Sequence, residues 1–360
     1  MVEEHFTSAL NVQAGIEQPV QVNPYLQSRP RKRKPQLSLE EYVEGILSGN
    51  RVILSQAITL VESVNPEHFA LAQAIVDKCL PHAGNSIRIG ITGVPGVGKS
   101  TFIESFGKMI TAQGKKLAVL AIDPSSERSK GSILGDKTRM ETLCADPDAF
   151  IRPSPSGTTL GGVARKTRET SILCEAAGFN VILIETVGVG QSETAVKSMV
   201  DFFLLLMISG AGDELQGIKR GIMEMADAIV ITKADGDNIA KAELAASQYR
   251  TALHLFPTNE NGWQVPVSTC SSLENKNIDK VWQTISDFKV RMTDSGWLQG
   301  NRNRQAVKIF YEWMEDVLKT RFYACGEVQN EIEHLLPLVK EGRLSPYQAA
   351  TIVLNPQKDK

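Results

Sequence analysis

The stretch Gly93-Val94-Pro95-Gly96-Val97-Gly98-Lys99-Ser100 decides the fold of this 360-residue chain. It fits the pattern G-x-x-x-x-G-K-[ST], in which the glycines allow backbone N–H groups to turn inward around phosphate oxygens. In this pattern Lys99 reaches the β- and γ-phosphates of a nucleotide, and the Ser100 hydroxyl can ligate Mg²⁺. The sequence therefore predicts a phosphate site made of Gly93, Gly96, Val97, Gly98, Lys99, Ser100 and Thr101.

The residues on either side of this loop have the patterns that the motif requires. Ile87–Ile91 is a short apolar-rich run that suits a β-strand. After the loop, apolar residues recur at helical spacing: Phe102, Ile103, Phe106, Met109 and Ile110. A strand, a glycine loop and a helix in this order favour a phosphate-binding loop over a glycine-rich turn without a ligand.

Further strand candidates alternate with helical patterns through the middle of the chain. They are Leu117–Ile122, Phe150–Arg152, Val181–Ile184, Phe202–Ile208, Ile229–Thr232 and Val265–Val267. Continuous apolar strands separated by helices indicate a mainly parallel sheet that is covered on both faces. The predicted fold class is therefore α/β.

A second segment indicates which nucleotide is bound. Ile229–Ile231 leads into Thr232-Lys233-Ala234-Asp235, which resembles the Asn-Lys-x-Asp segment of GTPases, with Thr232 in place of Asn. The Asp235 carboxylate can accept hydrogen bonds from guanine N1–H and from the 2-amino group, and adenine lacks this pair of donors. Ser271-Ser272-Leu273 falls where GTPases carry Ser-Ala-Leu, whose backbone supports the guanine. We therefore predict that Lys233, Asp235 and Ser271 bind the guanine of GTP or GDP, although Lys233 and Asp235 also suit a solvated turn.

Acidic residues follow two predicted strands at the edge where open α/β sheets bind ligands. Asp123 comes directly after Leu117–Ile122, and Glu185 comes directly after Val181–Ile184. Glu185-Thr186-Val187-Gly188 resembles the Asp-x-x-Gly of GTPases with Glu in place of Asp, so the Gly188 N–H could meet the γ-phosphate.

Phosphoryl transfer needs charge neutralisation and a positioned water molecule more than it needs covalent chemistry. Asp136 lies between the two acidic strand ends, in the segment 131–139, which contains two glycines. We predict that Mg²⁺ is held by Ser100, Asp123, Asp136 and Glu185, and that Gln191 is a weaker candidate for orienting water. Helix caps or solvated loop residues are the alternative roles for these acids and for Gln191.

Taken together, these motifs resemble the MeaB/ArgK family, GTPases that chaperone adenosylcobalamin-dependent methylmalonyl-CoA mutase. The resemblance extends from the first helices after Ser38 into the C-terminal helices. Its most specific segments are Gly93–Thr101, Asp123–Ser126, Gly131–Met140, Glu185–Glu193 and Gly212–Lys219. Thr232 departs from the family pattern, as does Asn277, where a glycine is usual.

The resemblance implies GTP hydrolysis that is coupled to cofactor loading and protection of the mutase. No D-x-H-x-x-G segment surrounds any of the five histidines, so we expect cobalamin to be bound by the partner rather than by this chain. It implies a homodimer formed largely by the C-terminal helices. It also implies that Gly212–Lys219 is a switch, in which Asp213 helps to set the switch and Lys219 approaches the nucleotide. The catalytic candidates are Lys99, Asp136, Glu185, Gln191 and Lys219.

These expectations divide the chain into a flexible leader at 1–37, an N-terminal helical segment at 38–85, a P-loop GTPase domain at 86–275 and a C-terminal helical dimerisation region at 276–360. The formal net charge of −2 favours neither nucleic acid nor an anionic membrane as a partner. The basic segment 29–35 is bracketed by prolines and suits a solvated leader better than a nucleic-acid patch. The five scattered cysteines favour reduced thiols and a cytoplasmic location.

Three alternatives stay open at this stage. A nickel-insertion GTPase would require a Cys/His cluster, and Cys79-Leu80-Pro81-His82 is the nearest candidate. An ATP-dependent kinase of a transport protein is disfavoured by Asp235. A nucleotide-gated interaction module with negligible turnover is disfavoured by the acids near the phosphate loop.

Overall fold

Seven parallel strands of the described residues form one sheet, in the order β3-β2-β4-β1-β5-β6-β7. The computed structural model describes residues 36–122, 140–154, 160–186, 192–210, 220–257 and 259–355. Met1–Ser38 and Leu39–Lys360 form separate units, and the sheet belongs to the second. The strands are β1 (Ile87–Gly93), β2 (Leu117–Ile122), β3 (Ala149–Ser154), β4 (Val181–Thr186), β5 (Phe202–Met207), β6 (Ala228–Ile231) and β7 (Val267–Thr269).

The sheet confirms the predicted α/β fold with a parallel sheet. Strands β1, β2, β4, β5 and β6 are buried along their whole length, as expected for apolar strands covered on both faces. The prediction for the last strand was displaced by two residues, because β7 begins at Val267 rather than at Val265. Pro266 has no N–H to donate, and its carbonyl accepts a hydrogen bond from the Ile229 N–H, so regular pairing starts after it.

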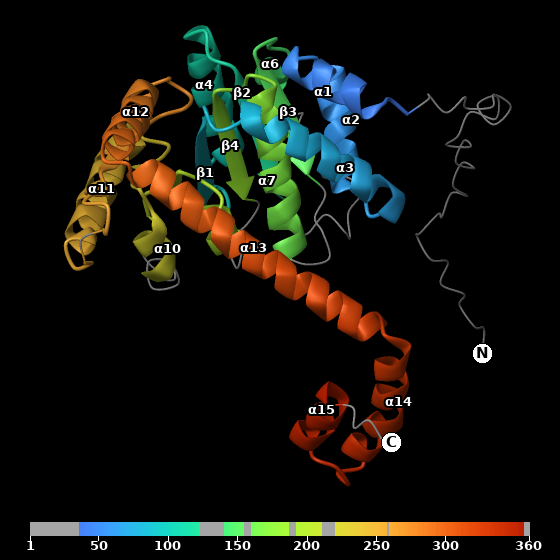
Figure 1. The fold of residues 1–360 in the computed structure, drawn as a ribbon. Helices are drawn as coiled ribbons and strands as arrows, with labels where there is room; N and C mark the ends of the chain where they lie inside the picture. Colours follow the sequence, from blue (N-terminus) through green and yellow to red (C-terminus); the bar gives the residue numbers. More distant parts are fainter. Residues whose placement is uncertain are drawn as a thin grey trace, which may run out of the picture. The chain divides into compact units, whose positions relative to one another are not determined.

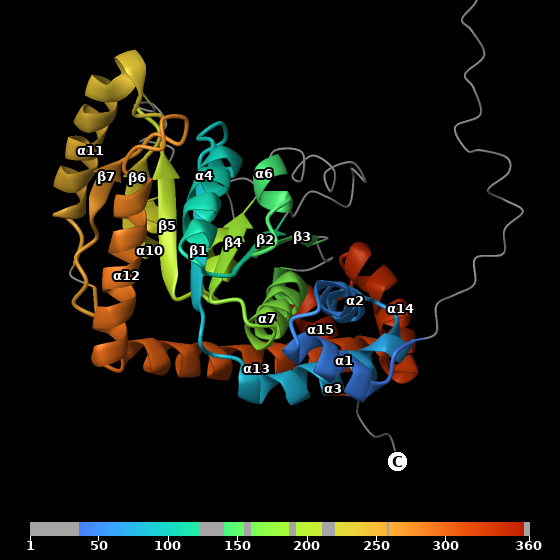
Figure 2. The same ribbon diagram turned by 90° about the horizontal axis from the view of Figure 1, so that it is seen from above.

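Helices cover both faces of the sheet (Figures 1 and 2). On one face, α4 (Lys99–Ala112) packs on β1 and β2 and contacts α12 (Ile278–Asp294). On the other face, α7 (Leu160–Ala176) packs on β2, α8 (Ser192–Lys197) on β1 and β4, and α10 (Arg220–Met225) on β5. The helix α11 (Ile239–Leu253) contacts β6 and β7, and the short helix α6 (Glu141–Cys144) contacts α4 and β3.

The N-terminal helices form an outer layer against α7. They are α1 (Leu39–Leu47), α2 (Arg51–Glu62) and α3 (Pro66–Cys79), followed by the 3-10 turn η2 (Leu80–His82). All three helices contact α7, and Figure 1 shows them beside it. They occupy most of the segment 38–85 that was predicted to be helical.

Three helices follow α12 (Ile278–Asp294) in the described residues: α13 (Trp297–Ala324), α14 (Gly326–Lys340) and α15 (Pro346–Leu354). The preceding helix, α12, buries one apolar face in the main core through Ile285, Phe288 and Met292. The first part of α13 crosses the strand starts, and further along this helix the Arg165 guanidinium of α7 lies 4.5 Å from the ring of Trp313. Within the described residues, no helix combines the length and the apolar character needed to span a membrane.

A buried ionic network fixes α13 to the starts of β1 and β5. The Arg302 guanidinium donates to both carboxylate oxygens of Asp201, at 2.8 and 2.6 Å, and to the carbonyls of Gly84 and Ser86. Nearby, Arg88 donates to both carboxylate oxygens of Glu175, at 3.0 and 2.8 Å. Because these charges are largely buried and paired, they define where α13 begins its path along the sheet.

Candidate functional site

The phosphate loop connects the carboxyl end of β1 to the start of α4. Gly93 ends β1 so close to β5 that a Cβ built on it would lie 2.4 Å from the carbonyl oxygen of Leu206. Gly96 and Gly98 have φ angles of +77° and +89°, a region that residues with a Cβ rarely adopt. The glycines of the motif are therefore required by the backbone path as well as by the predicted approach of a phosphate.

Lys99 starts α4 and folds back over this loop. Its Nζ donates a hydrogen bond of 2.9 Å to the Gly93 carbonyl. Burial lowers the pKa of Lys99, while the negative charges of Glu185 and Glu193 act in the opposite direction. The lysine thus lies in the field of two acidic side chains at the edge of the sheet where the strands end.

Both of these acids are buried. Glu185 lies in β4 and is 5% exposed, and Glu193 lies in the first turn of α8 and is completely buried. Glu193 was not predicted as a site residue, although its position just after the segment that resembles Asp-x-x-Gly was a usable signal. The Ser100 side chain belongs to the first turn of α4. Mg²⁺ prefers oxygen ligands, so the Ser100 hydroxyl and the Glu185 carboxylate are chemically suited to bind the predicted ion.

The segment Thr232–Asp235, which we call the guanine segment, is joined to the phosphate loop by Thr232. Its Oγ1 donates to the Val97 carbonyl at 2.7 Å and lies 3.2 Å from the Met207 carbonyl, which is also within hydrogen-bond distance. Thr232 is buried. The residue that departs from the usual Asn therefore makes a direct side-chain contact with the loop.

Asp235 is oriented by Ser271–Leu273, the second segment predicted to contact the guanine. The Ser271 Oγ donates to the Asp235 Oδ2 at 2.6 Å, and the Glu274 N–H donates to the Ser271 Oγ. The Ala234 N–H donates to the Cys270 carbonyl, so the backbones of the two segments are paired as well. This arrangement fixes the carboxylate that was predicted to accept the guanine donors.

Further contacts hold these segments around the loop. The Ser105 Oγ of α4 donates to the Ser272 carbonyl at 2.9 Å. Lys233 has a φ of +56°, and a Cβ built on Gly98 would lie 3.9 Å from the Lys233 Cε, so this side chain passes the loop. Asn277 has a φ of +59°, which explains why a glycine suits that position. Its Nδ2 donates to the Thr269 carbonyl at 3.1 Å.

The described candidates thus gather at one edge of the sheet, around the carboxyl ends of β1, β4 and β6. They are Gly93, Gly96, Val97, Gly98, Lys99, Ser100, Thr101, Glu185, Lys233, Asp235 and Ser271. The other predicted site residues, Asp123, Asp136, Gly188, Gln191 and Lys219, lie outside the described residues, as does Asp213. Their roles stay predictions.

The family model described as "Methylmalonyl Co-A mutase-associated GTPase MeaB" matches residues 54–327, which is more than half of the chain. The chain belongs to the MeaB family. It is therefore a GTPase that binds GTP and GDP, and its family is associated with methylmalonyl-CoA mutase. The predicted resemblance is confirmed.

Relatives of this MeaB-family chain occur in bacteria and animals. "GTPase ArgK" of Escherichia coli (strain K12) is 48% identical over 309 residues, 86% of this chain and 93% of the relative. "Methylmalonic aciduria type A homolog, mitochondrial" of Mus musculus is 44% identical over 337 residues, 91% of this chain and 81% of the relative.

A solved structure described as a "LAO/AO transport system kinase" is also similar to this MeaB-family chain. It has a TM-score of 0.71 and 40% sequence identity, covering 89% of this chain and 98% of that one. Since the similarity spans nearly the whole solved chain, it supports the arrangement of the sheet together with the flanking helices.

Proposed function

We propose that this MeaB-family GTPase is a chaperone that couples its nucleotide state to cofactor loading and protection of methylmalonyl-CoA mutase. The observation that carries the proposal is the hydrogen bond from Thr232 Oγ1 to the Val97 carbonyl, which connects the guanine segment directly to the phosphate loop. This connection suits a protein whose conformation reports which guanine nucleotide is bound. The family association with the mutase supplies the partner. The cobalamin belongs to that partner.

The residues of the chain have separate roles in this proposal. Asp235, held by Ser271, accepts the guanine donors, and the loop N–H groups surround the phosphates. On nucleotide binding, Lys99 exchanges its hydrogen bond with the Gly93 carbonyl for the β- and γ-phosphates. Gln191 orients the attacking water, and Lys219 approaches the nucleotide when the complex forms.

Ser100 and Glu185, together with Asp123 and Asp136, would hold Mg²⁺. When bound, the ion neutralises negative charge on the transferred phosphoryl group. The Gly188 N–H would donate to the γ-phosphate. Glu185 is buried at the end of β4, where a bound cation would offset its charge.

The C-terminal helices supply a surface for a second copy of the chain. Exposed apolar side chains recur along α13 at helical spacing: Val307, Phe310, Tyr311, Met314 and Leu318. A contiguous apolar stripe on a helix is typical of a protein–protein contact. We therefore propose that the chain forms a homodimer mainly through these helices and that it is cytoplasmic.

The decisive experiment mixes the purified chain with the methylmalonyl-CoA mutase of the same organism. We expect a complex on size-exclusion chromatography, and we expect the rate of GTP hydrolysis in the complex to differ from that of the free chain. A Lys99→Ala variant should lose turnover both alone and in the complex, because the phosphates lose their main cation. Absence of a complex together with an unchanged rate would reject the chaperone proposal.

The two alternative activities make different predictions. A nickel-insertion GTPase needs a cluster of metal-binding side chains. Within the described residues, no group of three His, Cys, Asp or Glu side chains could hold a metal ion. A kinase would prefer ATP, so calorimetry that showed tighter binding of ADP than of GDP would favour that function instead.

A further inference from the structure

Lys233, in the middle of the guanine segment, has an unusual backbone conformation. Its φ of +56° lies in the left-handed region, which residues other than Gly, Asn and Asp rarely adopt. The other described non-glycine residues with a positive φ are both asparagines, Asn275 and Asn277. A lysine stays in this conformation where neighbouring groups hold it there.

The residues on either side of Lys233 are held by the ends of neighbouring strands. The Thr232 N–H donates to the Met207 carbonyl at 2.7 Å, and the Ala234 N–H donates to the Cys270 carbonyl at 3.0 Å. These contacts fix the backbone before and after Lys233. The Lys233 carbonyl itself needs a separate donor.

Asn238, the residue directly before α11, supplies that donor. Its Nδ2 donates to the Lys233 carbonyl at 2.7 Å. Its backbone N–H donates to the Asp235 carbonyl at 3.0 Å, within the 3-10 turn η3 (Gly236–Asn238). Asn238 therefore contacts the guanine segment twice, although it was not predicted as a site residue.

The side-chain amide of Asn238 is oriented by Ser209, which lies two residues after the end of β5. The Ser209 Oγ donates to the Asn238 Oδ1 at 2.7 Å, and both residues are partly buried. Because the hydroxyl takes the oxygen of the amide, its NH₂ group is directed to the Lys233 carbonyl. A chain of hydrogen bonds thus runs from the end of β5 through Asn238 to the guanine segment.

The backbone of Lys233 determines where its side chain lies. A Cβ built on Gly98 would lie 3.9 Å from the Lys233 Cε, so the lysine stem passes the phosphate loop. Asp235, which is predicted to accept the guanine donors, follows two residues later. A change in the φ of Lys233 would therefore displace the lysine stem and alter the path of the chain toward Asp235.

We propose that Asn238 is a positioning residue for guanine binding, which acts through the Lys233 carbonyl and is itself oriented by Ser209. This inference rests on the proposed function, because it requires Lys233 and Asp235 to bind the guanine. The base is held equally in the ground state and in the transition state of phosphoryl transfer. Loss of the Asn238 amide should therefore raise the KM for GTP and leave kcat nearly unchanged.

The test measures GTP hydrolysis and GDP affinity for Asn238→Ala and Ser209→Ala. For Asn238→Ala we expect the KM for GTP and the Kd for GDP to rise about tenfold, with kcat within about twofold of the unaltered chain. Ser209→Ala should raise both constants only about threefold, because the Asn238 amide can still donate to Lys233.

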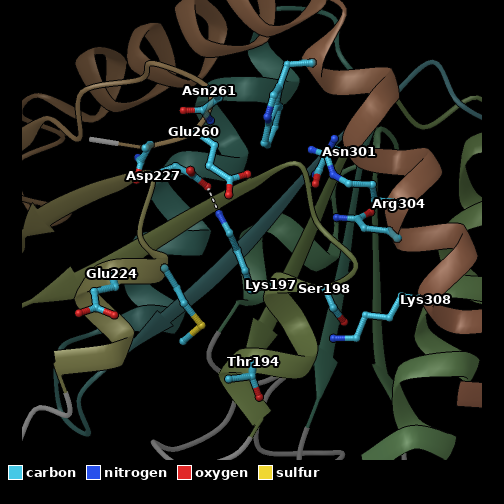
Figure 3. Close-up of a pocket in the computed structure, with 14 residues that line it drawn as sticks. Thr194, Lys197, Ser198, Glu224, Asp227, Glu260, Asn261, Asn301, Arg304 and Lys308 are labelled. Atoms are coloured by element: carbon cyan, nitrogen blue, oxygen red, sulfur yellow. Dashed lines mark hydrogen bonds and ion pairs between the residues drawn. The ribbon is translucent and has the colours of Figure 1, made fainter. Parts of the chain in front are cut away.

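The matched control is Asn301→Ala. Asn301 is an asparagine of α13 that lines a hollow of about 420 Å³, shown in Figure 3. Asp227, which directly precedes β6, lines the same hollow, so the control lies at the strand starts and away from the nucleotide site. Its KM, kcat and GDP affinity should equal those of the unaltered chain.

A double variant tests whether Ser209 acts through Asn238. Ser209→Ala combined with Asn238→Ala should bind GDP no more weakly than Asn238→Ala alone, because the amide that Ser209 orients is already absent. Independent structural effects of the two residues would add instead. An additive loss would overturn the proposed chain of contacts.

The outcomes separate this inference from the proposed function when Asp235→Asn is measured in parallel. If Asp235→Asn loses GDP affinity while Asn238→Ala keeps the KM and the GDP affinity of Asn301→Ala, only the inference fails. A fall in kcat at constant KM would also overturn it. If Asp235→Asn keeps its GDP affinity, the guanine assignment in the proposed function fails, and the inference fails with it. Urea unfolding checks that each variant is folded, and Ser209→Ala carries the same test if Asn238→Ala is not.

Discussion

Thr232 Oγ1 and the carbonyl of Val97 are joined by a hydrogen bond of 2.7 Å, which links the guanine segment directly to the phosphate loop. Both residues are buried, so the Thr232 hydroxyl supplies the hydrogen-bond donor that the buried Val97 carbonyl needs. The link gives the two ends of the nucleotide site a fixed separation. A change at Thr232 should therefore affect nucleotide affinity although its side chain was not predicted to touch the nucleotide.

We expect Thr232→Val to weaken GDP binding about tenfold, because a buried carbonyl is left without its donor while the side-chain volume is nearly kept. Isothermal titration calorimetry measures the effect. Thr251→Val is the matched control, since Thr251 is exposed and its hydroxyl donates to the Ser247 carbonyl of its own helix. Equal affinities for the two variants would show that the link does not position the guanine segment.

Asp235→Asn should change the base that is preferred. The amide of Asn can donate to the 2-carbonyl oxygen of xanthine, whereas the guanine 2-amino group loses its acceptor. We expect at least a tenfold loss of GDP affinity and a gain for xanthosine diphosphate, measured by competition against a fluorescent nucleotide. A parallel loss for both nucleotides would mean that Asp235 only supports the fold through Ser271.

Glu175 should make the stability of the chain depend on acid pH. Burial acts to raise the pKa of Glu175, but its hydrogen bonds and charge interaction with Arg88 outweigh burial and hold that pKa below its ordinary value of 4.5. The ionised carboxylate therefore stabilises the fold above pH 4.5, and this stabilisation is lost as the pH falls through the folded-state pKa.

Glu175→Gln should lower the free energy of unfolding by about 3 kcal/mol near neutral pH, because Arg88 remains buried without its counter-charge. The difference in the free energy of unfolding between the variant and the unaltered chain should shrink as the pH falls below 4.5. Urea unfolding at several pH values measures it, with the exposed Glu274→Gln as the control. A difference that stays constant down to the lowest pH would contradict this assignment.

Leu318→Asp tests the proposed homodimer. Leu318 is 59% exposed on the apolar stripe of α13, and a buried carboxylate at a subunit contact is strongly unfavourable. We expect the variant to be monomeric by light scattering, with its thermal stability as a monomer retained. Thr320→Asp, on another face of the same helix, should stay dimeric. A monomeric unaltered chain would reject the dimer outright.

Local patterns predicted much of this structure. The apolar runs located six strands of the described sheet and placed the seventh two residues too early, and the spacing of Gly93, Gly98 and Lys99 located the loop between β1 and α4. Both signals are contained in short windows of sequence. Asp235 and Ser271 were also predicted from short segments, but only the structure shows that one holds the other.

Long-range side-chain contacts could not be predicted in the same way. Ser105 and Ser272 are far apart in sequence, and neither residue type indicates its partner. Burial of Glu193 depends on how α8 packs, which its short sequence does not specify. The start of β7 depended on which residue opposes Ile229 in the neighbouring strand. These features arise only when distant segments are packed together.

The hydrogen bonds of Arg302 have a consequence for how the chain folds during its synthesis. Its guanidinium holds Asp201 and the carbonyls of Gly84 and Ser86, all of which leave the ribosome well before it does. Until residue 302 has emerged, the buried carboxylate at the start of β5 lacks this cation, even though every strand of the sheet has already been synthesised. A nascent chain that stalls before α13 would therefore carry all the strands of the sheet without the cation that pairs with Asp201.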